Sequence, residues 1–218
     1  MKPLLLINFK TYRESTGKEA VKLAKLIDKL AKGKKADVMI AVETADIYPI
    51  SNAVGIPILA QHIDPIEEGA HTGAILARDI VDNGAKGTLL NHSEKRMKFA
   101  DLKKSIGIAR KNGLKTVVCV DNVSYVRRVR RFGPDYIAIE PEELIGTGIS
   151  ISAAKPKLIQ KAVAAAKGIP LLCGAGISNG EDVKKALELG ASGVLVASAV
   201  VKAADQKAII LEMINALR

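Results

Sequence analysis

The sequence predicts an α/β protein of the (β/α)₈ barrel class, with its 218 residues in a single domain. Short apolar runs alternate with helical patterns eight times, and no linker or shift in composition divides the chain. The runs are rich in Val, Ile and Leu without polar alternation, which is typical of parallel strands buried on both faces. A doubly wound open sheet is the alternative, but it usually has five or six strands, and nothing here marks a reversal of strand order.

The predicted strands are short, and turn signals such as Gly133-Pro134 precede some of them. They cover residues 4–9, 38–42, 56–60, 87–90, 116–120, 136–139, 169–173 and 193–196. Eight such strands, each followed by a helix, indicate a closed barrel rather than an open sheet.

The helical patterns between the strands have recognisable ends. Thr16 with Glu19, and Ser178 with Glu181, fit the capping box, in which the first side chain accepts a hydrogen bond from a backbone N–H of the first turn. Pro156 suits the first turn of another helix. Further helix ends are predicted at Asp101, Asn112-Gly113 and Gly190.

Composition favours a soluble globular protein, with 48% hydrophobic and 26% charged residues. No apolar run approaches the roughly 20 residues that span a bilayer, and the first ten residues lack a signal-peptide pattern, so we expect a cytoplasmic location. Cys119 and Cys173 both fall in predicted strands. They are expected to be buried free thiols, and they are too few for a zinc site by themselves.

Chemically useful side chains follow several predicted strands. The active site of a (β/α)₈ barrel lies where the carboxyl ends of its strands meet. Asn8 and Lys10 lie at the end of the first strand, His92 follows the fourth and Glu140 the sixth. A lysine, a histidine and a glutamate at separate strand ends form a set of acid–base and charge-stabilising groups.

The segment from Glu140 to Gly148 combines an ionisable group with a hinged loop. Pro141 stiffens the chain directly after the strand, and Gly146-Thr147-Gly148 gives the backbone freedom at the other end. We therefore expect a lid that closes over a phosphate and excludes water from Glu140. The alternative is a strand, a turn and a glutamate on the surface.

Three segments resemble the signatures of the triosephosphate isomerase family: Asn8-x-Lys10, the block from His92 to Arg96, and the segment that begins Glu140-Pro141. The resemblance extends along the whole chain. Its short length and the sequence from Cys173 to Ile177 are similar to the compact archaeal branch. The family implies a TIM barrel, interconversion of dihydroxyacetone phosphate and glyceraldehyde 3-phosphate, and no metal or organic cofactor.

The resemblance also implies a role for each residue. Glu140 would be the base that removes a carbon-bound proton, and His92 would donate a hydrogen bond to the developing oxyanion. Lys10 would add a fixed positive charge, Asn8 would orient the substrate, and Glu94 would support these residues. His62 and His71 lack such surrounding residues in the sequence and are expected to be unsupported histidines.

Backbone amides are expected to hold the phosphate, since barrels commonly bind phosphate after strands seven and eight. By the resemblance these amides belong to Ile145, Gly146, Gly176, Ala197 and Ser198. Two departures from the family pattern are visible. Gly176 and Ala197-Ser198 replace a serine and a glycine pair, and Glu142-Glu143 replaces an apolar-aromatic pair after the loop proline. A dinucleotide site is not expected, because no G-x-G-x-x-G motif is present.

The partners of this chain are expected to be a small phosphorylated triose and further copies of itself. The segment from Gly69 to Gly73, which contains Thr72, resembles the loop through which family members dimerise. The resemblance to the compact branch favours a homotetramer, with a homodimer as the alternative, and Thr72 is expected to support the site.

The net charge of +10 raises the alternative of a nucleic-acid-binding protein. Its best local patch is formed by Arg127, Arg128, Arg130 and Arg131. These arginines alternate with valines on a predicted helix, which suits a solvated outer face, and no RNA-binding motif is present. We therefore expect neither a nucleic-acid nor a membrane partner, and a positive potential that attracts an anionic substrate. Another phosphate-binding barrel isomerase or lyase is the remaining alternative.

Overall fold

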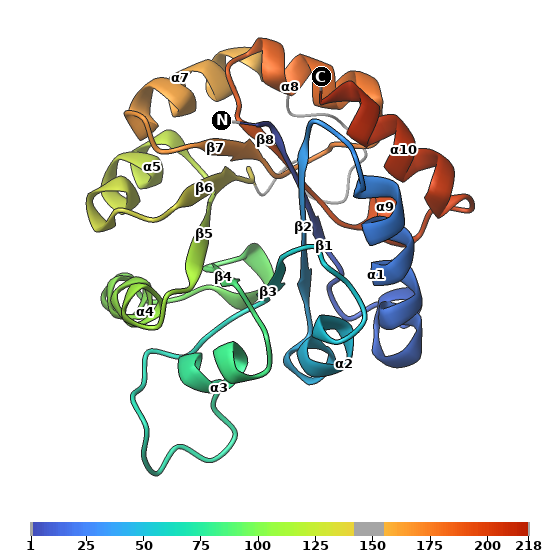
Figure 1. Ribbon diagram of the computed structural model, residues 1–218. Helices are drawn as coiled ribbons and strands as arrows, with labels where there is room; N and C mark the ends of the chain where they lie inside the picture. The colour runs from blue at the N-terminus through green and yellow to red at the C-terminus, as the bar shows by residue number, and fades with distance from the viewer. Residues whose placement is uncertain (1, 142–154, 218) are drawn as a thin grey trace.

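The computed structural model describes residues 2–141 and 155–217. The strands form one closed barrel in the order β1 to β8, every neighbouring pair is parallel, and helices surround the barrel (Figure 1). The strands are β1 (Leu4–Asn8), β2 (Asp37–Val42), β3 (Ile58–Ala60), β4 (Gly87–Leu90), β5 (Lys115–Val120), β6 (Tyr136–Ile139), β7 (Leu171–Cys173) and β8 (Gly193–Val196). The predicted (β/α)₈ barrel is confirmed.

Within the described ranges, the longer helices are α1 (Gly17–Ala31), α4 (Phe99–Lys111), α7 (Pro156–Ala166), α8 (Gly180–Glu188) and α10 (Gln206–Ala216). Shorter ones are α2 (Ile47–Ser51), α3 (Ala77–Asp82), α5 (Val123–Val129) and α9 (Ser198–Val201), with the 3₁₀ turns η1 (Arg13–Ser15), η2 (Thr44–Asp46), η3 (Ser93–Lys95) and η4 (Arg130–Phe132). No helix in these ranges combines the length and apolar character needed to cross a bilayer.

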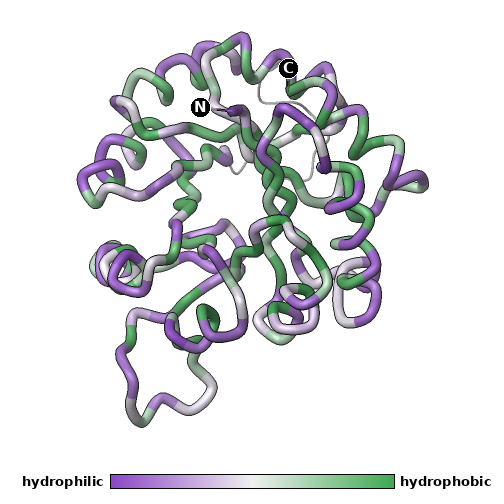
Figure 2. The backbone as a smooth tube through the Cα atoms, in the orientation of Figure 1, coloured by the Kyte–Doolittle hydropathy of each residue, from purple (hydrophilic) through white to green (hydrophobic). Residues whose placement is uncertain are grey.

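Two apolar layers hold the barrel together, because successive residues of a strand point to opposite faces. Leu5 and Ile7 of β1 pack with the surrounding helices, whereas Leu4 and Leu6 belong to a separate cluster inside the barrel. The interior cluster is Leu4, Leu6, Met39, Ala41, Leu59, Leu89, Val117, Cys119, Tyr136, Ala138, Leu172 and Leu195. Both faces of the strands are therefore apolar, as the unbroken runs predict, whereas hydrophilic positions lie on the outer helices and on the loops (Figure 2).

The barrel closes where β8 meets β1, and a glycine is needed there. Leu4 pairs with Gly193, whose φ of 152° is one that side-chain-bearing residues rarely adopt. A methyl group on Gly193 would collide with the backbone of Leu4. Close backbone approach at this position joins the first and last strands.

Both predicted capping boxes are wrong, although the helices begin close to the predicted places. Thr16 is the N-cap residue of α1, but its side chain makes no capping hydrogen bond. The carboxylate of Asp46 instead accepts from Gly17 N at 3.0 Å and 3.1 Å. The N-cap of α8 is Asn179 rather than Ser178, and Asn179 Oδ1 accepts from Asp182 N at 2.9 Å.

The segment between β3 and α3 extends away from the barrel (Figure 1). Its base is closed by Asp64, whose N–H donates to Ile75 O at 3.0 Å and whose carboxylate accepts from Ile75 N at 2.7 Å. Burial favours protonation of Asp64, but these bonds and the neighbouring His62 outweigh it and leave the pKa of Asp64 below its ordinary value. His62 is itself buried, with Nε2 3.2 Å from the Asp64 carboxylate. The expectation of an unsupported histidine at this position is therefore wrong.

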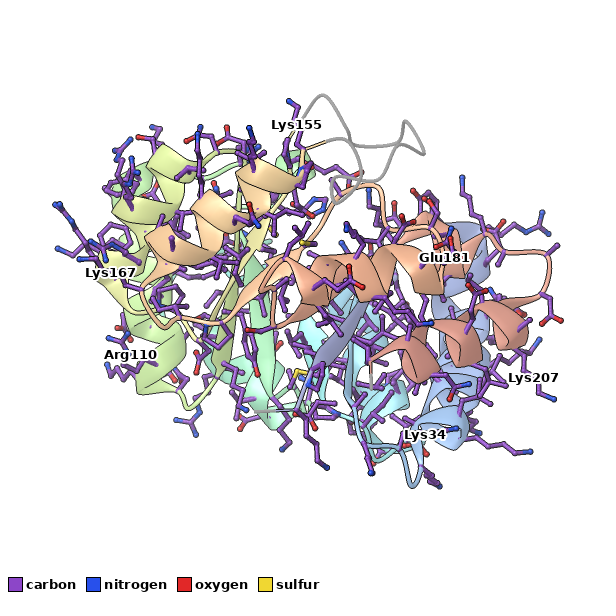
Figure 3. All side chains as sticks on the ribbon, turned by 90° about the horizontal axis from the view of Figure 1, so that it is seen from above. Lys34, Arg110, Lys155, Lys167, Glu181 and Lys207 are labelled. Carbon is purple, nitrogen blue, oxygen red and sulfur yellow. The ribbon has the colours of Figure 1, made fainter. Side chains whose placement is uncertain are left out.

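The arginine-rich surface lies on α5 and η4. Arg127, Arg128 and Arg131 are exposed, but Arg128 is not simply solvated, because its guanidinium lies 4.1 Å from the ring centroid of Phe99. Such a cation–π contact ties the arginine to the aromatic surface of the protein. Elsewhere, labelled charged side chains such as Lys34, Lys167 and Lys207 lie around the outer edge of the molecule (Figure 3).

Candidate active site

A cavity of about 350 Å³ opens at the carboxyl ends of the strands. Its lining combines the four predicted polar residues with the backbone that follows β7 and β8. The lining residues are Asn8, Lys10, His92, Ser93, Glu140, Gly174, Ala175, Gly176, Ile177, Ser178, Leu195, Val196, Ala197, Ser198 and Ala199. Residues more than 130 positions apart in the chain are therefore brought to one site by the closure of the barrel.

Glu140 lies directly after β6 and lines this cavity. Its backbone N–H donates to Val120 O at 2.7 Å, which fixes the start of its side chain against the end of β5. Only 4% of the residue is exposed, and Oε2 has no hydrogen-bond partner among the described residues. Burial raises the pKa of Glu140 to about 7, although the Cys119 thiol and the Lys10 charge act in the opposite direction. This carboxyl can both lose and accept a proton near neutral pH.

His92 faces Glu140 across the cavity, with Nε2 3.7 Å from Glu140 Oε1. Its Nδ1 accepts a hydrogen bond from Glu94 N at 3.2 Å, so the proton of the neutral ring lies on Nε2. Burial and the charge of Lys10 lower the pKa of His92 to about 4, against the opposing effect of Glu94. At neutral pH the ring is therefore uncharged and presents an N–H donor to the cavity.

Lys10 supplies the positive charge on the β1 side. Its Nζ lies 2.8 Å from Glu94 Oε1, and its backbone N–H donates to Asn8 Oδ1 at 3.0 Å. Gln61 Nε2 also donates to Lys10 O at 3.0 Å. These three bonds hold Lys10 in a left-handed backbone conformation with φ of 49°, which is uncommon for a residue with a side chain. Glu94, expected to support the site, bridges Lys10 and the His92 segment.

The predicted phosphate-binding residues are only partly within the described ranges. Gly176, with φ of 66°, lines the cavity, and so do Ala197 and Ser198 at the start of α9. Amides at a helix start have no partner within the helix and are suited to an anion. Ile145 and Gly146 lie outside the described residues, and so does the predicted lid from Glu140 to Gly148 beyond its first two residues, Glu140 and Pro141.

Thr72 does not lie with the other predicted residues in this chain. It is exposed on the segment that extends from the barrel between β3 and α3, and it does not line the cavity. A second cavity of about 390 Å³ lies on the β1–β3 side and shares Asn8, Lys10 and His92 with the first.

Two contacts of Glu140 were not predicted from the sequence. Cys119, assigned only as a buried thiol, lies close enough to influence the pKa of Glu140, and burial together with the nearby Glu140 raises the thiol pKa well above its ordinary value. Gly174 leaves space that Glu140 occupies, because a methyl group there would lie 2.5 Å from Glu140 Cγ. The signal for Cys119 is its place near the end of β5, the strand beside β6. Local sequence gives no signal for Gly174 in this role.

The acid–base set has no additional metal-binding cluster beside it within residues 2–141 and 155–217, since no three His, Cys, Asp or Glu side chains there could hold an ion. A neutral histidine donor, a buried carboxyl with a pKa near neutrality and a fixed lysine charge suit proton abstraction next to a carbonyl. The developing oxyanion would lie near His92 and Lys10.

Comparisons with known proteins agree over the full length of the barrel. The sequence model of one family, described as triosephosphate isomerase, matches residues 3–216. Triosephosphate isomerase of Methanocaldococcus jannaschii is 49% identical over 216 residues, which cover 97% of this chain and 99% of that protein. Those of Methanothermus fervidus and Archaeoglobus fulgidus are each 46% identical over 218 residues and cover 98% of both chains.

Proposed function

The chain belongs to the triosephosphate isomerase family, and we propose that Glu140 and His92 carry the proton transfers of its reaction. The enzyme interconverts dihydroxyacetone phosphate and D-glyceraldehyde 3-phosphate, a step of glycolysis and gluconeogenesis. Moving the carbonyl between adjacent carbons requires removal of a carbon-bound proton and formation of an enediolate. The observation that supports the assignment most strongly is the 3.7 Å approach of His92 Nε2 to Glu140 Oε1 in one buried cavity.

Glu140 is the base in this proposal. It takes the proton from one carbon and returns it to the neighbouring carbon, so the same carboxyl must accept and donate. A pKa of about 7, raised by burial, suits both steps near neutral pH. Gly174 leaves the carboxylate room to face the substrate, and Oε2, which has no hydrogen-bond partner in residues 2–141 and 155–217, is available to receive the proton.

His92 acts as the neutral electrophile, as a histidine is known to do in this family. Because Nδ1 is occupied by Glu94 N, the Nε2–H can donate to the substrate oxygens as negative charge develops on them. The reaction also moves a proton from one substrate oxygen to the other. Nε2 gives its proton to the oxygen that was the carbonyl and takes the hydroxyl proton of the neighbouring oxygen, so His92 is neutral again at the end of each turnover. Lys10 provides the fixed positive charge, and Asn8 orients the substrate.

The phosphate of the substrate is assigned to the mouth of the same cavity. The backbone near Gly176, Ala197 and Ser198 lines the cavity and supplies amides of the kind that bind phosphate. Ile145 and Gly146 complete this set as a prediction from the family resemblance. The replacement of side chains at Gly176 and Ala197 leaves main-chain donors in place.

The assembly and the location of the enzyme are also part of the proposal. The family has oligomeric members, and a homotetramer is favoured here over a homodimer, with Thr72 supporting the site from the segment between β3 and α3. The protein acts in the cytoplasm and without a cofactor. Measurement of the molar mass in solution by light scattering separates a tetramer of about 92 kDa from a dimer, since one chain is 23.1 kDa.

An isomerase assay on the purified protein tests the proposed activity. With glyceraldehyde 3-phosphate as substrate, formation of dihydroxyacetone phosphate is followed through a coupled reduction. Solvent deuterium should enter the carbon-bound position of the product, because the proton on Glu140 exchanges with water while the enediolate is bound. An inactive protein, or transfer of hydrogen without any exchange, would contradict the mechanism. Exchange should be lost when the assay is repeated with Glu140→Gln.

A further inference from the structure

Asn91 occupies an unusual place in the backbone, between the end of β4 and His92. Its φ is 60°, and the other non-glycine residues with positive φ in the described ranges are Lys10 and Lys167. A left-handed conformation costs energy for any residue with a side chain, and asparagine tolerates it better than most. The chain therefore changes direction at Asn91, immediately before the proposed electrophile.

The side chain of Asn91 is as constrained as its backbone. Only 2% of the residue is exposed, and both ends of the carboxamide are hydrogen-bonded. Nδ2 donates to Cys119 O at 2.8 Å, and Oδ1 accepts from Met97 N at 3.0 Å. The backbone oxygen of Asn91 also accepts from Arg96 Nη1 at 3.3 Å. One residue thus closes the loop that contains His92 and attaches it to β5.

The attachment point on β5 is also close to the base. Cys119 pairs in register with Ala138 of β6, two residues before Glu140, and its thiol influences the pKa of Glu140. The carboxamide of Asn91 therefore joins the strand that carries His92 to the strand that flanks Glu140. A shift of β4 against β5 at this point would change the distance between base and electrophile.

We propose that Asn91 is a positioning residue of the isomerase site: its turn and its two carboxamide hydrogen bonds fix the direction of the His92 ring towards Glu140. This inference rests on the roles proposed above for His92 and Glu140. Asn91 acts through its neighbours, since it does not line the cavity itself. The competing explanation is that Asn91 serves only as a stable turn between β4 and η3.

Two substitutions separate positioning from turn stability. Asn91→Gly keeps a residue that accepts positive φ but removes both carboxamide bonds, so the protein should fold. Its kcat should fall by roughly 10- to 100-fold with KM changed less than about threefold, because misplacement of a reacting group mainly lowers turnover. Asn91→Ala removes the same bonds and adds backbone strain, so it should show a similar kcat and an additional fall in Tm.

Nitrogen-15 NMR measures the protonation of the His92 ring as a function of pH. This titration would not change if Asn91 served only as a structural turn. In the unaltered protein the ring should remain neutral, with the proton on Nε2, down to about pH 4, as its burial requires. In Asn91→Gly a released ring gains access to water, so its titration should move upward towards the ordinary value of 6.5. The pH dependence of kcat should shift in the same direction.

Lys167→Gly is the matched control. Lys167 has the same kind of backbone, with φ of 48°, but lies at the end of α7 on the outer edge of the molecule (Figure 3). This variant should keep the kcat and the His92 titration of the unaltered protein. The inference would be overturned if Asn91→Gly kept the kcat and the His92 titration of the unaltered protein. It would also be overturned if the loss of kcat were fully explained by a smaller fraction of folded protein. Lack of isomerase activity in the unaltered protein would instead contradict the proposed function, while the NMR comparison still tests the orientation of His92.

Discussion

Glu140 should make the folded protein less stable at high pH than at low pH, and Glu140→Gln should remove this effect. A pKa of about 7 against the ordinary value of 4.5 corresponds to about 3 kcal/mol, at about 1.4 kcal/mol for each pKa unit. The folded protein holds the proton to higher pH than the unfolded chain does. The penalty is therefore absent below about pH 4.5, grows as pH rises, and is complete above about pH 7.

Urea unfolding of both proteins between pH 4.5 and pH 8 measures this penalty. At a fixed protomer concentration, the free energy of unfolding of Glu140→Gln should rise relative to the unaltered protein by about 3 kcal/mol across this range. Other titrating groups are common to both proteins and cancel in the comparison. Glu188→Gln, on α8, is the control and should show no such relative gain, because it removes a carboxylate that folding leaves exposed.

A difference between Glu140→Gln and the unaltered protein that stays constant within about 1 kcal/mol over this range would refute the reasoning. It would mean that the Glu140 carboxyl is not held at a raised pKa by burial. The assignment of a base that is poised near neutrality would then need another physical basis.

Three further predictions follow from contacts in the structure. Gly174→Ala places a methyl group in the space that Glu140 occupies and should lower kcat by roughly 10²-fold. Gly107→Ala, in open space on α4, is the control. It should leave kcat unchanged and raise the free energy of unfolding by about 0.5–1 kcal/mol. The carboxylate of Asp46 makes the capping bonds of α1, and Thr16 makes none. In a urea titration, Asp46→Ala should therefore lower the free energy of unfolding by about 1–2 kcal/mol. Thr16→Ala should change it by less than about 0.5 kcal/mol. Lys10→Met should lower kcat/KM by at least about 10²-fold at every ionic strength. Neutralising the four arginines of α5 and η4 should leave kcat nearly intact. Salt-sensitive RNA binding that is lost with those arginines would contradict this view of the surface.

The barrel was predictable because its strands are read from local apolar runs. β4, β6 and β8 have the predicted bounds, and two of the differences elsewhere have a local cause. β3 and β7 begin directly after Pro57 and Pro170, two residues later than predicted. Proline has no N–H to donate to the sheet. Pro57 and Pro170 therefore take part only as acceptors, from Ile40 N at 3.2 Å and Ile137 N at 3.0 Å, and each strand begins one residue later.

The helix caps show what local sequence does not contain. A serine or threonine three residues before a glutamate fits a capping box, but α1 takes its cap from Asp46, 29 residues along the chain. The competing carboxylate is brought there by the barrel, so no local pattern reveals it. At α8 the capping residue is one position later, because Asn179 and Asp182 form the bonds that were assigned to Ser178 and Glu181.

The site was predictable as a set of residues but not as a geometry. Asn8 and Lys10 lie at the end of β1, His92 follows β4 and Glu140 follows β6, and a barrel necessarily brings such positions to one face. The protonated nitrogen of His92 depends on a backbone N–H, and the space for Glu140 depends on a glycine of another strand. Neither feature can be read from residue types alone. The lid predicted from Glu140 to Gly148 stays a prediction.

The turnover of Glu140→Gln tests the central claim most directly. The amide keeps the shape of the side chain but cannot accept the proton from carbon, so kcat should fall by roughly 10²- to 10⁴-fold while binding of a phosphorylated inhibitor such as phosphoglycolate is retained. His92 should remain neutral in the variant, because its burial is unchanged. A kcat for Glu140→Gln within about threefold of that of the unaltered protein, far from the loss expected of a general base, would contradict the assignment of Glu140 as the base.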